Sequence, residues 1–163
     1  MDTQYITATA PGLATFVYYI TNDQDPFLKL VEYVYSSWQD EDIGPSVISI
    51  SYGGDEYEFG EDYLRRINQE FGKLALLGIT VLASSDDQGA VGITSDDDCL
   101  RKGINGELNV TNGTEIYSVS FPASAPYVTA VGGTEGGSAV SDGVTGETAW
   151  MYSGGGFSDF FKR

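Results

Sequence analysis

Two adjacent aspartates, Asp86 and Asp87, are the first candidates for chemistry in this chain of 163 residues. They stand in the polar segment Ser85–Gly89, directly after the apolar run Ile79–Ser84. If that run is a strand of an open parallel sheet, the aspartates lie at its carboxyl end, where such sheets bind ligands. Taken alone, the two residues fit an Asx turn, a pair of ligands for Mg²⁺ or Ca²⁺, or a catalytic acid.

The residue types present restrict the chemistry further. The chain has no histidine, which excludes a Ser-His-Asp or Cys-His nucleophile system and every histidine-dependent metal site within these residues. Acid and base chemistry therefore falls to carboxylates. Asp96–Asp98 is a second candidate for binding cations, but it lacks the alternating spacing of a calcium loop and is more typical of a solvated loop. Cys99 is the single cysteine, so these residues form no internal disulfide.

The net charge argues against two classes of partner. Eight Lys and Arg residues against 24 Asp and Glu residues give a formal charge of −16. This is the wrong sign for binding a nucleic-acid backbone or an anionic membrane surface. No apolar run approaches the roughly 18 to 20 residues of a membrane span. The acidic excess fits either a solubilising surface or tolerance of acid, since carboxylates lose their charge near pH 4 and few cations remain to repel each other.

Apolar runs alternate with amphipathic stretches, which predicts an α/β fold. Helices are expected at Asp2–Ala10, from Pro26 to about Gln39 and from about Glu61 to Leu77, with Gly78 closing the last. Strands are expected at Ala14–Ile20, Ser46–Tyr52, Ile79–Ser84 and Tyr127–Gly132, and a hairpin at Ala139–Trp150. The strands are apolar throughout, which is typical of a parallel sheet covered on both faces. The long polar stretch Ser85–Ser120 is typical of a functional or mobile loop.

The order and spacing of four segments carry a family resemblance. The segments are Ser49–Gly53, Gly78–Ala90, Phe121–Thr134 and Ser153–Ser158. Together they resemble the sedolisin family of serine-carboxyl peptidases, and the resemblance covers nearly the whole chain. It implies a subtilisin-like parallel sheet flanked by helices, peptide hydrolysis at acid pH, and a Ser-Glu-Asp catalytic set with a separate Asp at the oxyanion hole. It also implies that residues 1–163 are the central part of a single peptidase domain, truncated at both ends.

On this resemblance, Asp87 is the counterpart of the oxyanion aspartate, and Asp86 stands where the family has a glycine. A carboxyl group that donates to an oxyanion must be protonated, which requires low pH or a pKa raised by burial and a nearby negative charge. If position 86 needs a positive φ, aspartate tolerates it better than most residues, but with strain. Asp2 matches the Asp of the family's acidic pair. The Glu of that pair would precede Met1, and the serine is expected in a Gly-Thr-Ser segment beyond Phe157.

The resemblance assigns further sites. Ser51, Tyr52 and Gly53 match the strand edge that pairs with extended substrate. Asn109 and Asn112 begin two glycosylation sequons, and family members are secreted or lysosomal, so a secreted, lysosomal or vacuolar glycoprotein is implied. The implied partner is a peptide or protein substrate. No metal or other cofactor is expected in this chain, because the family's calcium site belongs to the missing C-terminal part.

The main expectation is thus an acid peptidase whose 163 residues lack the Glu and Ser and do not turn over peptides alone. One alternative is a catalytically dead module that binds extended peptides beside Ser51, Tyr52 and Gly53. Another is a cation-dependent domain that uses Asp86 and Asp87. Without the resemblance, Asp2 fits an exposed helix N-cap and Ser51–Gly53 fits a simple strand end.

Overall fold

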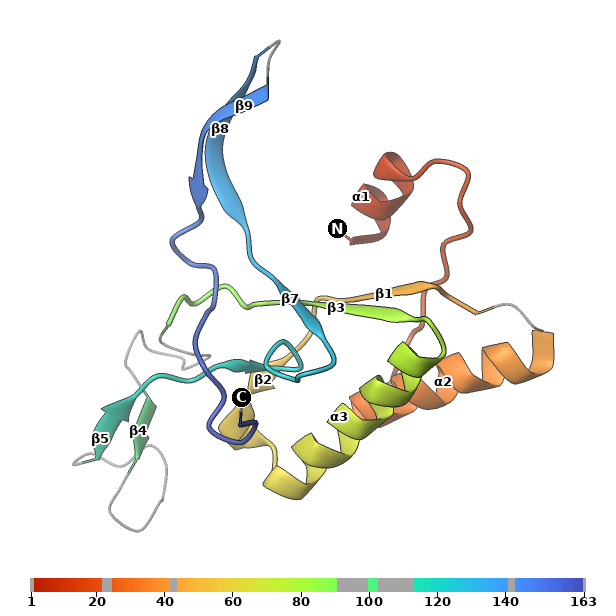
Figure 1. The fold of residues 1–163 in the computed structure, drawn as a ribbon, viewed down its shortest axis with the longest axis horizontal. Coiled ribbons are helices and arrows are strands. Elements are labelled where there is room, and N and C mark those ends of the chain that lie inside the picture. The colour runs from red at the N-terminus through yellow and green to blue at the C-terminus, as the bar shows by residue number, and fades with distance from the viewer. Residues whose placement is uncertain are drawn as a thin grey trace.

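Three parallel strands form the centre of the fold (Figure 1). The computed structural model describes residues 2–21, 25–41, 44–90, 100–102, 113–140 and 143–162. Strands β1 (Val47–Ile50), β3 (Thr80–Ser84) and β7 (Thr129–Val131) pair in the order β1-β3-β7. Their register places Ile50 beside Ala83 and Ala83 beside Ala130. The predicted strands in these three regions are therefore confirmed, as is the α/β class.

Two long helices cover one face of this sheet. Helix α2 (Pro26–Glu41) begins at the predicted proline, whose fixed φ suits a first helical position. Helix α3 (Glu61–Leu76) ends in a Schellman motif, in which Gly78 has a φ of +82° and its amide donates to the Ala75 carbonyl. Both helices lie below the sheet in Figure 1, whereas α1 (Asp2–Thr9) lies above it and buries none of its residues.

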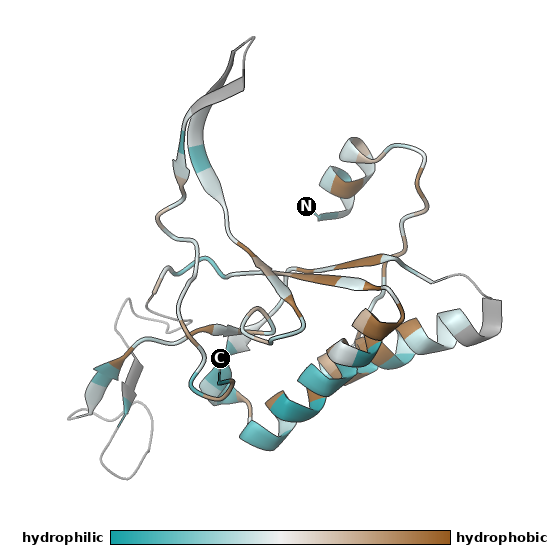
Figure 2. Ribbon diagram, viewed as in Figure 1, coloured by the Kyte–Doolittle hydropathy of each residue, from teal (hydrophilic) through white to brown (hydrophobic). Residues whose placement is uncertain are grey.

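The core fills the space between the sheet and these two helices, where Figure 2 shows the apolar colouring concentrated. Its largest buried apolar side chains are Phe27, Phe71, Phe121, Leu64, Ile67, Leu74, Val31 and Val34. Burial alternates along β1, because Ile48 and Ile50 face the helices while Val47 and Ser49 are exposed. The expectation of strands buried on both faces is therefore wrong for the described residues, since α2 and α3 pack on the same face.

The predicted strand at Ala14–Ile20 is wrong in this structure. The segment is extended along the outer side of β1, and Tyr18 and Ile20 pack against the core, but it belongs to no sheet. A strand needs a hydrogen-bonded neighbour, and a cavity separates this segment from β1. Within the described residues, β1 therefore pairs only with β3 and keeps its other edge unpaired.

Smaller strands add three antiparallel pairs. Strand β2 (Gly54–Asp55), followed by the 3₁₀ helix η1 (Glu56–Glu58), pairs with β6 (Ser120–Phe121). Within the predicted long loop, β4 (Leu100–Lys102) pairs with β5 (Thr114–Ile116). The predicted hairpin is confirmed and is longer than expected, because β8 (Thr134–Val140) pairs with β9 (Gly143–Ala149). It projects away from the sheet in Figure 1. No described helix is long and apolar enough to cross a membrane.

Candidate functional site

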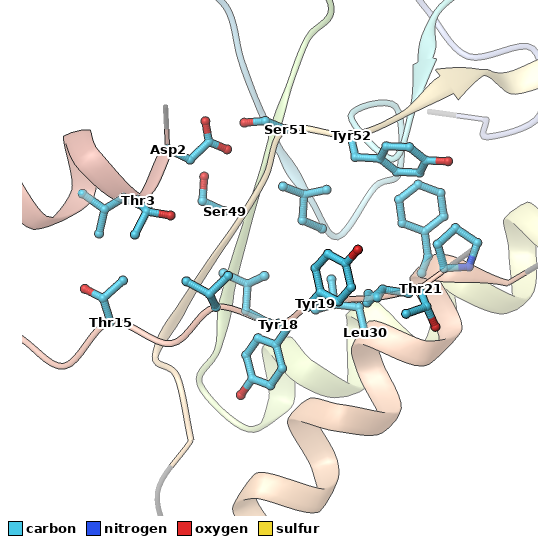
Figure 3. A pocket seen from close by; sticks show the side chains of 17 residues that line it. Asp2, Thr3, Thr15, Tyr18, Tyr19, Thr21, Leu30, Ser49, Ser51 and Tyr52 are labelled. Carbon is cyan, nitrogen blue, oxygen red and sulfur yellow. The ribbon is translucent and has the colours of Figure 1, made fainter. Parts of the chain in front are cut away.

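The unpaired edge of β1 forms one wall of a cavity of about 520 Å³. Helix α1 and the segment Thr15–Thr21 form the opposite wall, and Phe27 and Leu30 of α2 contribute its apolar floor. Asp2, Ser51 and Tyr52, which belong to the predicted site, all line this cavity. In Figure 3 the carboxylate of Asp2 lies over β1 at the same end of the cavity as Ser49 and Ser51. The fold thus brings a carboxylate from α1 to an open strand edge.

Tyr52 and Gly53, which follow β1, differ in their surroundings. The side chain of Tyr52 is 63% exposed, and its ring lies 5.9 Å from the ring of Phe27, centroid to centroid. Gly53 does not line the cavity. A Cβ on Gly53 would lie 2.6 Å from the Phe121 carbonyl oxygen and 2.8 Å from Ser120 Oγ, so the close approach of β6 excludes a side chain there. The structure therefore gives Gly53 a packing role of its own.

The second group of predicted residues, Asp86 and Asp87, lies in the turn that follows β3. Asp86 has a φ of +89° and is the only non-glycine residue with a positive φ in the described part of the chain. Position 86 therefore has the positive φ considered for it above, a conformation that favours glycine. The Asp86 carboxylate accepts a 2.6 Å hydrogen bond from the Asp87 amide, and the side chain of Asp87 is exposed.

Asp55 joins Asp86 in a group of carboxyls that the sequence reasoning missed. Asp55 is only 3% exposed, at the start of the segment that follows β1. Burial raises the pKa of Asp86; the hydrogen bond from the Asp87 amide opposes this, and the negative charges of Asp55 and Asp87 add to it. Burial and the charge of Asp55 also raise the pKa of Glu58. No signal in the sequence indicated this, because Asp55 lies in β2, whose pairing with β6 joins it to Ser120.

A glycine-rich strap, defined here as Ser153–Phe157, lies across this turn. The Gly154 amide donates to the Asp86 carbonyl oxygen at 3.1 Å, and the Gly89 amide donates to the Tyr152 carbonyl oxygen at 2.8 Å. A Cβ on Gly154 would lie 1.7 Å from the Ser85 carbonyl oxygen, so only glycine fits. A second cavity, of about 530 Å³, is lined by the strap together with Ser85 and Ser124, whose buried hydroxyls have no hydrogen-bond partner among the described residues.

The residues predicted for the site thus lie in two different parts of the structure. Asp2, Ser51 and Tyr52 share the cavity beside β1, whereas Asp87 does not line it. Asn109, Asn112, Cys99 and Asp96–Asp98 lie outside the described residues. Among the residues that are described, no three His, Cys, Asp or Glu side chains lie close enough together to hold a metal ion.

Several peptidases are similar to this chain in sequence. Tripeptidyl-peptidase 1 from Bos taurus and from Homo sapiens are each 34% identical to it over 166 aligned residues, which cover the whole chain and 26% of each relative. Tripeptidyl-peptidase sed4 from Aspergillus fumigatus is 36% identical over 142 residues, or 87% of this chain and 20% of that protein. The chain thus spans about a quarter of the length of these relatives. No family model matches the chain.

A solved structure supports the same relationship. Pseudomonas sedolisin, a serine-carboxyl proteinase solved in complex with two molecules of pseudo-iodotyrostatin, is 30% identical and superposes with a TM-score of 0.52. The match covers 76% of this chain and 30% of that structure. The fold and the sequence therefore agree, and this chain belongs to the sedolisin family of serine-carboxyl peptidases.

Proposed function

We propose that this chain is the central part of an acid-acting peptidase domain, which hydrolyses peptide bonds as an endopeptidase or as a tripeptidyl-peptidase. In this proposal the catalytic set is Ser-Glu-Asp. Asp2 is the Asp that orients the general-base Glu, and Asp87 donates a hydrogen bond to the oxyanion in its protonated form. Asp2 and Asp87 lie within the 163 residues, whereas the Glu before Met1 and the Gly-Thr-Ser serine do not.

The observation that carries the proposal is the position of Asp2 in the cavity beside the open edge of β1. An extended peptide that pairs with this edge would have its backbone amides and carbonyls satisfied by β1, and the apolar floor at Phe27 and Leu30 would accept its side chains. Ser51 and Tyr52 continue that edge toward the carboxyl end of the sheet. A substrate bound in this way would pass close to Asp2, and therefore close to the general-base Glu that Asp2 orients in this proposal.

Because the Glu and Ser are not in this chain, we expect the 163 residues alone to cleave no peptide. The test compares this chain with the natural full-length protein at about pH 4, where carboxyl chemistry of this kind is poised. The natural protein should cleave a peptide library, and the lengths of the products distinguish internal cleavage from release of tripeptides. Serine-type cleavage by the 163-residue chain alone would contradict the assignment of the missing groups.

Asp2→Asn in the natural protein tests the role of Asp2. A loss of kcat of at least about 100-fold is expected for removing a carboxylate from the catalytic set, with KM changed much less. The matched control is Asp62→Asn, because Asp62 is also an exposed aspartate in the first turn of a helix but does not line the cavity. Equal activity of the two variants would remove Asp2 from the catalytic set.

A second function, a catalytically dead module that binds extended peptides, is favoured by the open edge of β1 and its cavity of about 520 Å³. The intact mass of the natural protein after deglycosylation separates the two. A mass well above 17.5 kDa supports the peptidase, because the missing segments then exist in the molecule. A mass near 17.5 kDa supports the binding module, which calorimetry should then show to bind peptides without cleaving them.

The remaining parts of the proposal concern the environment of the enzyme. We propose a secreted, lysosomal or vacuolar protein, glycosylated on Asn109 or Asn112 or on both. Its substrates are peptides or proteins, and nucleic acid and membrane are not partners, since the chain carries a charge of −16. Calcium belongs to a part of the family domain outside this sequence. Glycopeptide mapping of the natural protein tests the two sequons directly.

A further inference from the structure

The glycine-rich strap is held at both of its ends. At its start, the Ser153 hydroxyl oxygen accepts a 2.6 Å hydrogen bond from the Gly133 amide, next to β7. At its end, the chain enters a turn at Ser158–Phe161, here called the anchor. The Ser158 hydroxyl oxygen accepts hydrogen bonds from the amides of Phe160 and Phe161, at 3.1 and 2.9 Å. The strap therefore has little freedom of its own as long as the anchor stays in place.

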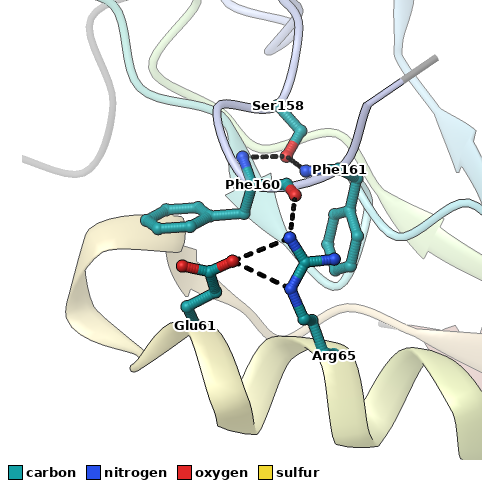
Figure 4. A network of polar contacts seen from close by, with 5 residues as sticks. All are labelled: Glu61, Arg65, Ser158, Phe160 and Phe161. Carbon is teal, nitrogen blue, oxygen red and sulfur yellow. Dashed lines mark hydrogen bonds and ion pairs between the residues drawn. The ribbon is translucent and has the colours of Figure 1, made fainter.

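Arg65 of α3 holds the anchor against the rest of the fold (Figure 4). Its Nη2 donates to the Phe160 carbonyl oxygen at 3.0 Å, and its Nε and Nη2 both donate to Glu61 Oε1, at 2.9 and 2.7 Å. The ion pair with Glu61, one turn earlier on the same helix, fixes the direction of the guanidinium group. A backbone carbonyl of the anchor is thus bound by a side chain that is itself held in place.

The 3₁₀ helix η1 holds the same anchor from a second side. The Tyr57 hydroxyl donates to the Asp159 carboxylate, and the Tyr57 ring packs edge-on against Phe160 with the centroids 5.4 Å apart. The carboxylate of Glu56, which is 1% exposed, accepts a 3.3 Å hydrogen bond from the Asp159 amide. The anchor is therefore joined to η1 as well as to α3.

Between its two ends the strap touches the turn that holds Asp86, the one non-glycine residue with a positive φ among the described residues. Asp86, at a φ of +89°, persists in this conformation only if its surroundings over-determine it. The strap supplies such a restraint, because the Gly154 amide donates to the Asp86 carbonyl oxygen and the Gly154 backbone packs closely against the Ser85 carbonyl. A rotation of Asp86 would turn the peptide that leads to Asp87.

We infer that Arg65 is a positioning residue for Asp87. By holding the anchor in place, Arg65 keeps the strap hydrogen-bonded to Asp86, and this fixes the direction of the peptide that leads from Asp86 to Asp87. The role of Asp87 in this inference rests on the proposed function. The physical coupling between Arg65 and the strap does not, and it can be measured without any activity. A failure of the peptidase proposal and a failure of this coupling are thus separate results.

The test is amide hydrogen exchange on the natural full-length protein, resolved to single amides by NMR, with Arg65→Ala compared with Arg66→Ala. Arg66 is the matched control, because it is the next residue of α3, is similarly exposed and pairs with Glu70 rather than with the anchor. In Arg65→Ala the amides of Gly154 and Gly89 should exchange at least about tenfold faster. The amide of Leu82, in the central strand β3 between β1 and β7, reports global opening and should change less.

The same experiment can overturn the inference. Equal acceleration at Gly154 and Leu82 would mean that Arg65 stabilises the whole fold without any special link to the strap. An unchanged rate at Gly154 would mean that the anchor does not hold the strap. Should Arg65→Ala not fold, Tyr57→Phe replaces it, since this variant keeps the ring against Phe160 and removes only the hydroxyl that binds Asp159. The exchange of Gly154 and Gly89 is then measured in Tyr57→Phe, and the same results support or overturn the inference.

A second measurement tests the step from the strap to Asp86. Glycine at position 86 removes the strain that the strap restrains. In an Asp86→Gly background, Arg65→Ala should therefore accelerate exchange at Gly154 by a smaller factor than in the parent chain. The same factor in both backgrounds would show that the anchor and Asp86 are independent, and would overturn the link between Arg65 and Asp87.

Discussion

The amide of Gly154 donates a 3.1 Å hydrogen bond to the carbonyl oxygen of Asp86, and no Cβ fits at position 154. We predict that Gly154→Ala lowers the free energy of unfolding by about 1 to 3 kcal/mol, because the added atom meets the backbone of Ser85 rather than a movable side chain. Urea unfolding measures the change. Gly155→Ala is the control, since nothing lies within 4 Å of a Cβ there. A similar loss in both variants would contradict the close packing of the strap.

Glycine should be better than aspartate at position 86. Asp86→Gly is predicted to raise the free energy of unfolding by about 1 kcal/mol at neutral pH, because it removes a strained positive φ and a carboxylate surrounded by negative charge. Asp87→Gly, at the neighbouring position without a positive φ, should instead lower it by about 0.5 to 1 kcal/mol. Thermal or urea unfolding distinguishes the two signs, and a loss of stability in Asp86→Gly would show that its hydrogen bond to the Asp87 amide outweighs the strain.

The raised pKa of Asp86 predicts a specific pH dependence. Burial raises this pKa above the ordinary value of 3.8, so the folded state holds the proton more tightly than the unfolded chain does. The resulting stabilisation is fully present below the ordinary pKa and is lost as the pH rises through the raised one. Relative to Asp86→Asn, the parent chain should therefore gain stability as the pH falls from neutral to below 3.8. If the free energies of unfolding of the parent chain and of Asp86→Asn changed equally with pH over that range, this prediction would be contradicted.

Glu70 should have the opposite pH dependence. Its burial raises its pKa, but hydrogen bonds from Lys73 and Arg66 and their positive charges outweigh this and lower it below the ordinary 4.5. The stabilisation from these pairs is present above pH 4.5 and is lost as the pH falls through the lowered pKa. Glu70→Gln should thus cost about 1 kcal/mol near pH 7. The difference should shrink in strong acid, and urea unfolding at pH 7 and pH 2.5 is the check.

The isolated chain should be only weakly stable. Large apolar side chains are exposed at Leu13, Val17, Met151 and Phe157, and one face of the sheet has no helix packed against it in the described structure. Exposed apolar surface and an unpaired strand edge both favour association. We expect the 163 residues to aggregate or to unfold at low temperature, as monitored by light scattering and circular dichroism. A cooperative transition above about 55 °C, ordinary for an intact domain, would contradict this.

Local chemistry made much of the fold predictable. Pro26 and Gly78 mark the start of α2 and the end of α3 because each residue restricts or permits a particular φ. The segment Ala14–Ile20 has the composition of a strand, yet strand formation depends on a partner edge as well as on composition. The sequence could not show that β1 keeps this edge free.

The candidate site was predictable to a lesser degree. The strand-end position of Asp86 and Asp87 follows from the order of helices and strands, and the positive φ of Asp86 agrees with the glycine that the family has there. The burial of Asp55 was not predictable, since it depends on β2 pairing with β6 across more than 60 positions of sequence. Contacts over such separations leave no periodic signal in the chain.

Helix α1 buries none of its residues, and this has a consequence for the entropy of catalysis. A carboxylate in a catalytic set contributes a high effective molarity only if it is held close to one position, within about 0.5 Å. Asp2 stands in the first turn of a helix that buries none of its residues. In this structure its side chain therefore keeps much of the conformational entropy that a fixed catalytic position would remove. In the proposed catalytic set, the rate enhancement from Asp2 would therefore depend on what packs over α1, so covering that helix would serve catalysis as well as stability.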